Sequence, residues 1–525
     1  MIERKRFPFG LVLIFGSFWV LFAAFGQVLA ARYGFLTSEG AAISMRAIVA
    51  AQGDGMTMAT LDLPQPPLPY FMAIPFAMLG LQYPAIWVSA MMAAILCTWY
   101  FASFRLEIEN EPVLVILPLL VPLQPGVLAG GAGGTAGITA VALLAFASYF
   151  GVRFTLERQA FEEMRAAGRM SAWVSSERYQ GRRVRFLWSA ALLLGLAGFA
   201  KSSLIVALPI YLMAIPFLLP GHERRDIPKI LTLALLLFMP VVAVHLMWMY
   251  AGWVLNDDPW RGLAAPDGFV SQLRGVDVLP AVKMAPALAM GHVALGMLAT
   301  CAVFVYVLVR LRSVSVFFLC IAPFSVEVVA LMTGHGLQFR GYLTLTSLLA
   351  MILIFLGAKV GRFGPLELKV LAGIMCLGTA GSWIYFSASP QREDRAFAAL
   401  VSGRPEELFT FPGQRAVAAM VSANPGMEQI LMDERAGFGV IAILNRFDPF
   451  ILSHQSRYRF ANENPNLGAD LVAVRREEWE WRKSVAAQEG WLPLEAARTA
   501  AFRPLVETDD WLLLERKTGG VASKQ

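Results

Sequence analysis

Long apolar runs repeat along the chain up to about residue 386, and they limit its fold more than any other feature. Each is close to the length at which a helix crosses the ~30 Å hydrocarbon core of a bilayer. Polar residues do not recur in them every few positions, as they do in amphipathic helices of soluble proteins. Only 16% of the residues are charged, against roughly 25% in soluble domains. We therefore predict a polytopic α-helical membrane protein.

We predict about eleven spans from these runs. They cover residues 10–31, 83–104, 112–128, 135–152, 187–200, 204–219, 230–253, 286–309, 314–332, 342–358 and 370–386. Residues 68–80 are apolar but too short to cross a bilayer, so we expect an interfacial or re-entrant segment there. The basic N-terminus and the arginine-rich segment 153–186 belong in the cytoplasm by the positive-inside rule.

The composition changes after residue 386, where charged residues become frequent and short strand-like and helix-like stretches alternate. Strand-like stretches are residues 429–432, 450–452, 470–474 and 511–514, and helix-like stretches are 415–423 and 434–444. Alternation of this kind predicts a small α/β domain. We therefore divide the chain into a transmembrane domain, 1–386, and an extramembrane α/β domain, 387–525, on the side opposite the N-terminus.

The charge balance and the cysteines exclude some classes of function. The net charge is +6, which fits cytoplasmic loops that lie against anionic lipid. No patch of interleaved basic and aromatic residues is present, so we expect no nucleic-acid partner. The four cysteines all fall inside apolar runs, where they predict small core residues and neither a disulfide framework nor a metal site.

The stretch that follows the first span, residues 32–70, is unusually rich in functional groups for a connection between spans. It ends near a proline-rich run, residues 64–67, and from Tyr33 onward it carries four charged side chains: Glu39, Arg46, Asp54 and Asp62. A short spacer needs neither acids nor a rigid proline run. We therefore interpret residues 32–70 as the catalytic first external loop of a membrane enzyme.

Two cations are expected at the same outer face. Lys201 lies between two apolar runs, where an ammonium is costly without an anion, although snorkelling to the interface would also satisfy it. Arg340 begins another span, and its guanidinium suits bidentate contact with phosphate. Two cations beside an acidic loop fit a lipid-phosphate leaving group. Glu39 would then be the base that takes a proton from an acceptor hydroxyl.

Four stretches in this order resemble a known family. They are Ser38–Ala41, Asp62–Tyr70, Gly195–Lys201 and Arg340–Leu343. They are similar to an Asp-Glu motif after the first span, a Lys-Pro-Pro-Leu-x-Tyr stretch, a Gly-Leu segment that ends in Lys, and an Arg-Tyr-Leu helix start. These motifs occur in the polytopic glycosyltransferases of the GT-C class, in the branch of lipid A aminoarabinose transferases and protein O-mannosyltransferases.

The resemblance implies an inverting transfer of a sugar from a polyprenyl-phosphate donor to an envelope acceptor, which could be a glycolipid, a polysaccharide or a protein. It places the chain in a bacterial inner membrane, with the α/β domain in the periplasm. Glu39 would be catalytic, and Lys201 and Arg340 would hold the donor phosphate. Further contacts to donor or acceptor are expected from Arg46, Asp62, His335 and Tyr342.

The sequence also departs from the family pattern. Ser38 replaces the first acid of the Asp-Glu motif, Gln65 replaces the usual Lys, and residues 134–137 lack the family's acid. A divalent metal is therefore left open, and so are two alternatives to an enzyme. One is a non-catalytic relative that binds lipid-linked sugar or scaffolds envelope assembly. The other is a lipid or sugar transporter, for which the mid-span residues His245, His292 and Glu327 are the candidates.

Overall fold

The computed structural model describes most of the chain. The described residues are 9–53, 67–166, 172–200, 208–219, 225–256, 296–311, 313–321, 339–388, 392–404, 411–452, 455, 458, 461, 469–477 and 502–517.

The chain forms two compact units. The helical unit comprises Met1–Gly26, Asp62–Pro69 and Val88–Pro405, and the mixed unit comprises Gln27–Leu61, Tyr70–Trp87 and Glu406–Gln525. Segments that follow the first helix thus belong to the same compact unit as the C-terminal residues. The division into domains at residue 387 stays a prediction.

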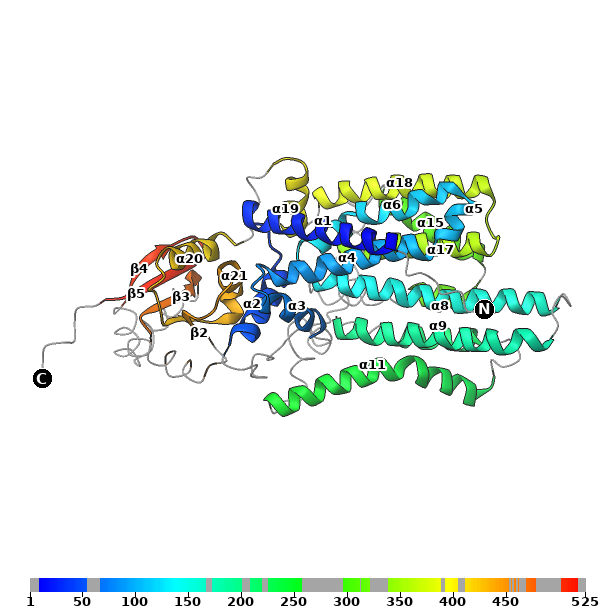
Figure 1. Cartoon of the computed structure of the whole chain (residues 1–525), viewed down its shortest axis with the longest axis horizontal. Coiled ribbons are helices and arrows are strands. Elements are labelled where there is room, and N and C mark those ends of the chain that lie inside the picture. Colours follow the sequence, from blue (N-terminus) through cyan, green and yellow to red (C-terminus); the bar gives the residue numbers. More distant parts are fainter. Residues whose placement is uncertain are drawn as a thin grey trace, which may run out of the picture. The chain divides into compact units, whose positions relative to one another are not determined.

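Helices make up the described part of the helical unit (Figure 1). They are α1 (Phe9–Tyr33), α4 (Pro84–Ser103), α5 (Arg105–Asn110), η2 (Pro112–Val115), α6 (Ile116–Leu123), α7 (Pro125–Ala132), α8 (Ala136–Ala166), α9 (Ala172–Ala200), α10 (Leu208–Leu218), α11 (Ile227–Asn256), α15 (Gly296–Leu311), α17 (Phe339–Lys359), α18 (Pro365–Ala388) and α19 (Arg392–Val401). The end of α1 and the start of α4 extend into the mixed unit.

Five helices among the described residues are long and apolar enough to cross a membrane, or six if one bent pair counts as a span. The five lie in α1, α4, α8, α11 and α18. Other predicted spans coincide with shorter apolar helices or lie partly outside the described residues. The polytopic class therefore holds, and the number of about eleven spans stays a prediction.

The helical stretch at the predicted span 112–128 is bent. The chain bends by 42° between α6 and α7. Gln124 is extended there, with ψ 124°, and Pro125 begins α7. Proline lacks the backbone N–H that would continue the helical ladder, so the residue before it leaves the helical conformation. Residues 68–78 form a short apolar helix, α3 (Leu68–Met78), which has 11 residues and contains Pro75. Its interfacial or re-entrant position stays a prediction.

Close backbone approach holds α9 against α11, and α9 also packs on α8 (Figure 1). A Cβ atom on Gly195 would lie 3.0 Å from Pro240 of α11, and one on Gly198 would lie 3.0 Å from the His245 ring. Small residues at such contacts let helices pack closely in lipid, where the hydrophobic effect does not drive helices together. His245 Nδ1 lies 2.8 Å from the Val241 carbonyl of its own helix. This buried histidine contacts its own helix, whereas His292 and Glu327 lie outside the described residues, so the transporter alternative stays a prediction.

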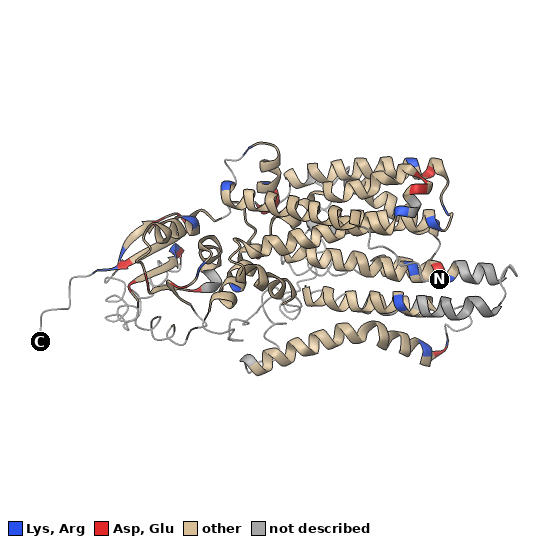
Figure 2. Ribbon diagram, viewed as in Figure 1, with Lys and Arg blue, Asp and Glu red and all other residues tan. Residues whose placement is uncertain are grey.

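Charge is sparse along the long helices. Figure 2 shows Lys and Arg gathered near one end of the helices of the helical unit. An i, i+4 pair, Arg105–Glu109, lies 2.8 Å apart on α5, and Arg153–Glu157 lies 2.7 Å apart on α8. A common basic end is what the positive-inside rule requires of loops that share the cytoplasmic side.

The mixed unit contains a five-stranded sheet. Its strands are β1 (Ile430–Met432), β2 (Phe450–Ile451), β3 (Leu471–Arg475), β4 (Phe502–Glu507) and β5 (Trp511–Arg516). The order is β2-β1-β3-β5-β4, with β1 parallel to β2 and β3, and with β5 antiparallel to β3 and β4. Helices α20 (Pro412–Ala423) and α21 (Glu434–Leu444) belong to the same unit.

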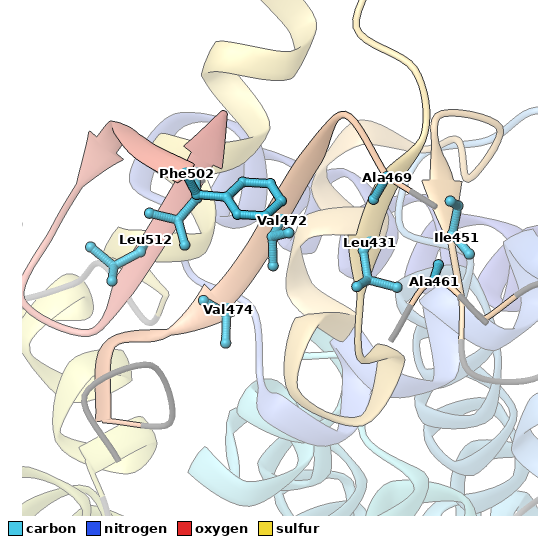
Figure 3. Close-up of a cluster of buried hydrophobic side chains, with 9 residues drawn as sticks. Leu431, Ile451, Ala461, Ala469, Val472, Val474, Phe502 and Leu512 are labelled. Atoms are coloured by element: carbon cyan, nitrogen blue, oxygen red, sulfur yellow. The ribbon is translucent and has the colours of Figure 1, made fainter. Parts of the chain in front are cut away.

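Alternate strand residues build one apolar core of this sheet (Figure 3). It includes Leu431 of β1, Ile451 of β2, Val472 and Val474 of β3, and Phe502, Leu512 and Leu514 of the antiparallel pair. Four of the five strands lie where the sequence predicted strands. The missed strand, β4, is an edge strand whose side chains are mostly exposed. Pro504 and a register shift near it interrupt its pattern, as edge strands tolerate.

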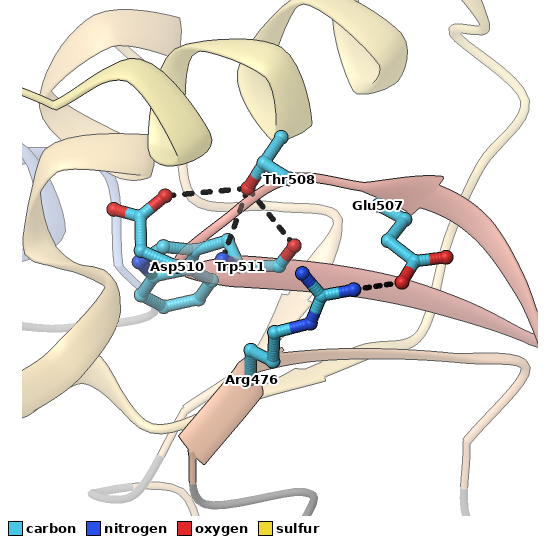
Figure 4. A network of polar contacts seen from close by, with 5 residues as sticks. All are labelled: Arg476, Glu507, Thr508, Asp510 and Trp511. Atoms are coloured by element: carbon cyan, nitrogen blue, oxygen red, sulfur yellow. Dashed lines mark hydrogen bonds and ion pairs between the residues drawn. The ribbon is translucent and has the colours of Figure 1, made fainter.

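Polar contacts hold the turn between β4 and β5 (Figure 4). The Thr508 hydroxyl accepts from the Trp511 N–H at 3.0 Å and lies 3.3 Å from Asp510 Oδ1. Arg476, which follows β3, forms an ion pair with Glu507, and its N–H donates to the Asp510 carbonyl at 3.0 Å. The turn is therefore attached to the end of the neighbouring strand.

Candidate functional site

A helix, α2 (Ser38–Gln52), forms where the sequence predicted an external loop. Gly34, with φ 67°, follows the end of α1 and redirects the chain. The Thr37 hydroxyl then accepts from the Gly40 N–H at 3.0 Å and caps the new helix. Alanine is frequent in the segment that follows, and it has the highest helix propensity. The candidate catalytic acid therefore stands on a capped helix.

The only charged residues of α2 are Glu39 and Arg46, and both are half-buried. Together with half-buried Ala42 they occupy positions i, i+3 and i+7, which lie on one helix face. Nine other residues of α2 are buried: Gly40, Ala41, Ile43, Ser44, Met45, Ala47, Ile48, Val49 and Ala50. Glu39 also lies in the first turn, where the helix dipole favours a negative charge. The helix thus presents the Glu39 carboxylate and the Arg46 guanidinium along a single half-buried stripe.

Two elements contact α2 within the mixed unit: the first turn of α4 and the helix α21. Ser44 Oγ accepts from the Ala85 N–H at 3.2 Å, at the start of α4. The Gln52 amide donates to the Asn445 carbonyl at 3.1 Å, and α2 packs against α21. An apolar cluster fills the space between them: Ala30, Leu36, Ala41, Tyr83, Ile86 and Ala442, with Phe411 and Phe438 packed against it. The position of α2 therefore depends on residues from both ends of the chain.

Arg415 of α20 lies beside this cluster. Its guanidinium donates to the Ala30 carbonyl in the last turn of α1, at 2.8 Å. Burial lowers the pKa of Arg415, and the nearby Tyr83 opposes that effect. Burial raises the pKa of Tyr83, and the charge of Arg415 partly offsets the rise. The Arg415 guanidinium and the Tyr83 phenol therefore interact electrostatically.

The structure places the other predicted site residues only in part. Arg340 and Tyr342 lie in the first turn of α17, and their side chains are not among those described. Lys201, His335 and Asp62 lie outside the described residues, as do the acids Asp54, Asp257 and Asp258. The convergence of Glu39, Lys201 and Arg340 in one cavity therefore stays a prediction.

A metal site can be sought only among the described residues. Within them, no group of three or more His, Cys, Asp or Glu side chains is arranged to hold a metal ion. The glycines at positions 130, 131, 133 and 134 divide between the end of α7 and the turn that follows it. Gly134 has φ 76°, in the left-handed region that glycine tolerates.

Sequence reasoning missed the residues that hold α2 from the C-terminal part of the chain. Asn445 ends α21 with φ 56°, and asparagine after an apolar helical stretch is a helix-stop signal. That signal marks the end of a helix but says nothing of its partner. Arg415 carries no local signal, because its contact with Ala30 joins positions 385 residues apart.

Comparison with known proteins identifies the fold. No family model matches the sequence, and no curated protein matches it. Among solved structures, the chain is similar to ArnT from Cupriavidus metallidurans in the apo state, with 12% sequence identity and a TM-score of 0.52. The match covers 96% of this chain and 98% of that one. The chain has a GT-C-like fold.

Two further structures match less well. ArnT from Cupriavidus metallidurans bound to undecaprenyl phosphate is 12% identical, with a TM-score of 0.46, and the match covers 97% of this chain and 98% of that one. The oligosaccharyltransferase of Archaeoglobus fulgidus in the apo form is 12% identical, with a TM-score of 0.41, and the match covers 92% of this chain and 72% of that one. The fold assignment rests on the first structure alone. It confirms, at the level of fold, the GT-C resemblance drawn from the four motifs.

Proposed function

We propose that this protein is an inverting glycosyltransferase that moves a sugar from a polyprenyl-phosphate donor to an acceptor of the cell envelope. The GT-C-like fold supports the class of protein. The observation that carries the proposal is the half-buried stripe of α2, which holds a carboxylate and a guanidinium on an otherwise buried helix.

The chemistry assigns a role to each charged group. The Glu39 carboxylate takes the proton of an acceptor hydroxyl as its oxygen attacks the anomeric carbon of the donor sugar. The bond between that carbon and the phosphate oxygen breaks, and the polyprenyl phosphate leaves with the bonding electron pair. Lys201 and Arg340 stabilise its developing negative charge. Arg46 lies seven positions after Glu39 on the same face of α2, and it contacts the acceptor or the donor sugar. Asp62, His335 and Tyr342 make further contacts of the same kind.

The same proposal includes a location. The protein lies in a bacterial inner membrane with its N-terminus in the cytoplasm, and α2 and residues 387–525 face the periplasm. The arginine-rich segment 153–186 supports the cytoplasmic side of this arrangement. Its partners are the lipid bilayer, the lipid-linked sugar and an envelope acceptor.

The deciding experiment is the Glu39→Gln variant, purified and reconstituted in lipid. A panel of polyprenyl-phosphate pentoses and hexoses is offered with candidate acceptors, and release of free polyprenyl phosphate is measured. We expect wild-type protein to release it with at least one donor, and the variant to release it at least about 100-fold more slowly. The matched control is Glu109→Gln, which removes an exposed acid of α5 and leaves turnover unchanged. Full turnover by Glu39→Gln excludes the assigned role.

A second candidate function is a non-catalytic protein that binds lipid-linked sugar. It is favoured by Ser38, which stands beside Glu39 where the family motif has a second acid. In that case wild-type protein would bind undecaprenyl phosphate, measured by thermal stabilisation, without releasing it from any donor of the panel. Sugar transfer by the purified wild-type protein excludes this candidate.

A further inference from the structure

We propose that Arg415 and Asn445 are positioning residues that hold α2, and Glu39 with it, in the orientation needed for transfer. This inference rests on the proposed function of Glu39. Both residues come from the segment 411–445, and each forms a hydrogen bond at a different end of the region that carries α2. The C-terminal part of the chain would then complete the active site without touching the substrate.

The first contact is at the N-terminal side of α2. Arg415 donates to the Ala30 carbonyl, which belongs to the last turn of α1, where carbonyl groups lack helical partners. A cation at this end also complements the helix dipole. Only residues 31–37 separate Ala30 from the first residue of α2. A displacement of the end of α1 is therefore passed to the Thr37 cap and to Glu39.

The second contact is at the C-terminal end of α2. The Asn445 carbonyl accepts from the Gln52 amide at 3.1 Å. The Asn445 side-chain amide donates to the Gly80 carbonyl at 3.2 Å, just after α3. Asn445 makes both contacts in the left-handed conformation, φ 56°, which asparagine adopts more readily than other side chains. One residue at the end of α21 thus joins α2 to the segment after α3.

Apolar contacts connect the two hydrogen-bonded ends. Ala41 of α2 and Ala442 of α21 belong to the same buried cluster, and Phe411 and Phe438 pack against it. Ala41 is two positions from Glu39, so the cluster restrains the turn that carries the carboxylate. Rotation of α2 about its axis would break these contacts and turn Glu39 away from its present face. Misplacement of a catalytic group by about 1 Å can lower a rate about 100-fold.

The test compares exchange and turnover in four variants of the full-length protein. Arg415→Gln removes the guanidinium, Arg415→Lys keeps one donor, and Gln52→Ala removes the amide that donates to the Asn445 backbone carbonyl. The matched control is Arg503→Gln, which breaks an exposed 2.8 Å pair with Glu515 in the same unit. Amide hydrogen exchange is followed in residues 38–52, and kcat and KM are measured with the donor identified by the panel.

We expect faster exchange in α2 and a kcat lowered about 10-fold to 100-fold in Arg415→Gln, with the donor KM within about 2-fold of wild type. Gln52→Ala shows the same effects at a smaller size, Arg415→Lys recovers part of the kcat, and Arg503→Gln matches wild type. A role in stability alone would lower the amount of active protein and leave kcat per folded molecule unchanged, which overturns the proposal.

The two proposals fail in different ways. If Glu39→Gln is inactive while Arg415→Gln keeps wild-type exchange and kcat, only the positioning role is overturned. If the wild-type protein releases no polyprenyl phosphate from any donor, the proposed function fails. If Glu39→Gln is fully active, the catalytic role of Glu39 fails, and the positioning role fails with it whatever the exchange rates are.

Discussion

At the scale of single residues, the site depends on how α2 starts. Thr37 is fully buried and lies two residues before Glu39. Its hydroxyl accepts a hydrogen bond from the Gly40 N–H. The four N–H groups at a helix start have no partners within the helix, so a buried start needs such a cap. Capping therefore fixes the local backbone on which the candidate carboxylate stands.

Replacement of Thr37 by Ala removes this acceptor. We expect the variant to lose about 1 kcal/mol of stability and to exchange amide protons faster in the first turn of α2. Thermal unfolding and hydrogen exchange measure the two effects. Thr37→Ser keeps the hydroxyl, and it is expected to stay close to wild type in both. Equal loss in the two variants would show that the methyl group matters and the cap does not.

At the scale of elements, a few small residues decide how closely the helices approach. Gly131 of α7 faces α4, and a Cβ atom there would lie 2.9 Å from the Ala93 Cβ. The Gly131 carbonyl also accepts from Ser89 Oγ of α4 at 2.7 Å. Alanine side chains have no rotamers with which to give way. The contact between α4 and α7 therefore needs glycine.

Gly131→Ala should force α7 away from α4. We expect a loss of about 1–3 kcal/mol, as is usual when atoms are added to a packed interior. The control is Gly373→Ala in α18, where an added Cβ meets nothing within 4 Å. That change is expected to be neutral or slightly stabilising because alanine favours helix. Thermal unfolding in the same lipid measures both. A neutral Gly131→Ala would contradict the contact.

At the scale of the whole molecule, the proposed function predicts on which side of the membrane each part of the chain lies. The basic helix ends predict one face in the cytoplasm, and the proposal puts α2 and the sheet on the other face. The four native cysteines lie in apolar helices. They can be replaced by alanine, so that single exposed cysteines report the side on which they lie.

Two such cysteines test the topology. Ala419→Cys lies on exposed surface of α20, and Glu109→Cys lies on exposed surface of α5. We expect a membrane-impermeant maleimide to label the first in intact cells with a permeabilised outer membrane. The second should be labelled only after the inner membrane is opened. Labelling of Glu109→Cys before that step, or protection of Ala419→Cys, would reverse the proposed sides.

The sequence by itself determined the features that depend on local composition. Apolar runs predict helices because backbone groups in lipid must bond within their own segment, and four strands of the sheet follow from short β-branched and apolar stretches. The bend at Gln124 and the edge strand β4 escaped prediction, although Pro125 and Pro504 mark both places. The resemblance drawn from the four motifs agrees with the GT-C-like fold.

Only the tertiary structure decided what holds the candidate acid. The bond between Gln52 and Asn445 joins residues 393 positions apart, and that between Arg415 and Ala30 joins residues 385 positions apart. No local pattern encodes such a pairing, because it follows from how two separate apolar surfaces fit together. The helix α2 could be read from its alanines and its Thr37 cap, but its partner could come only from the folded chain.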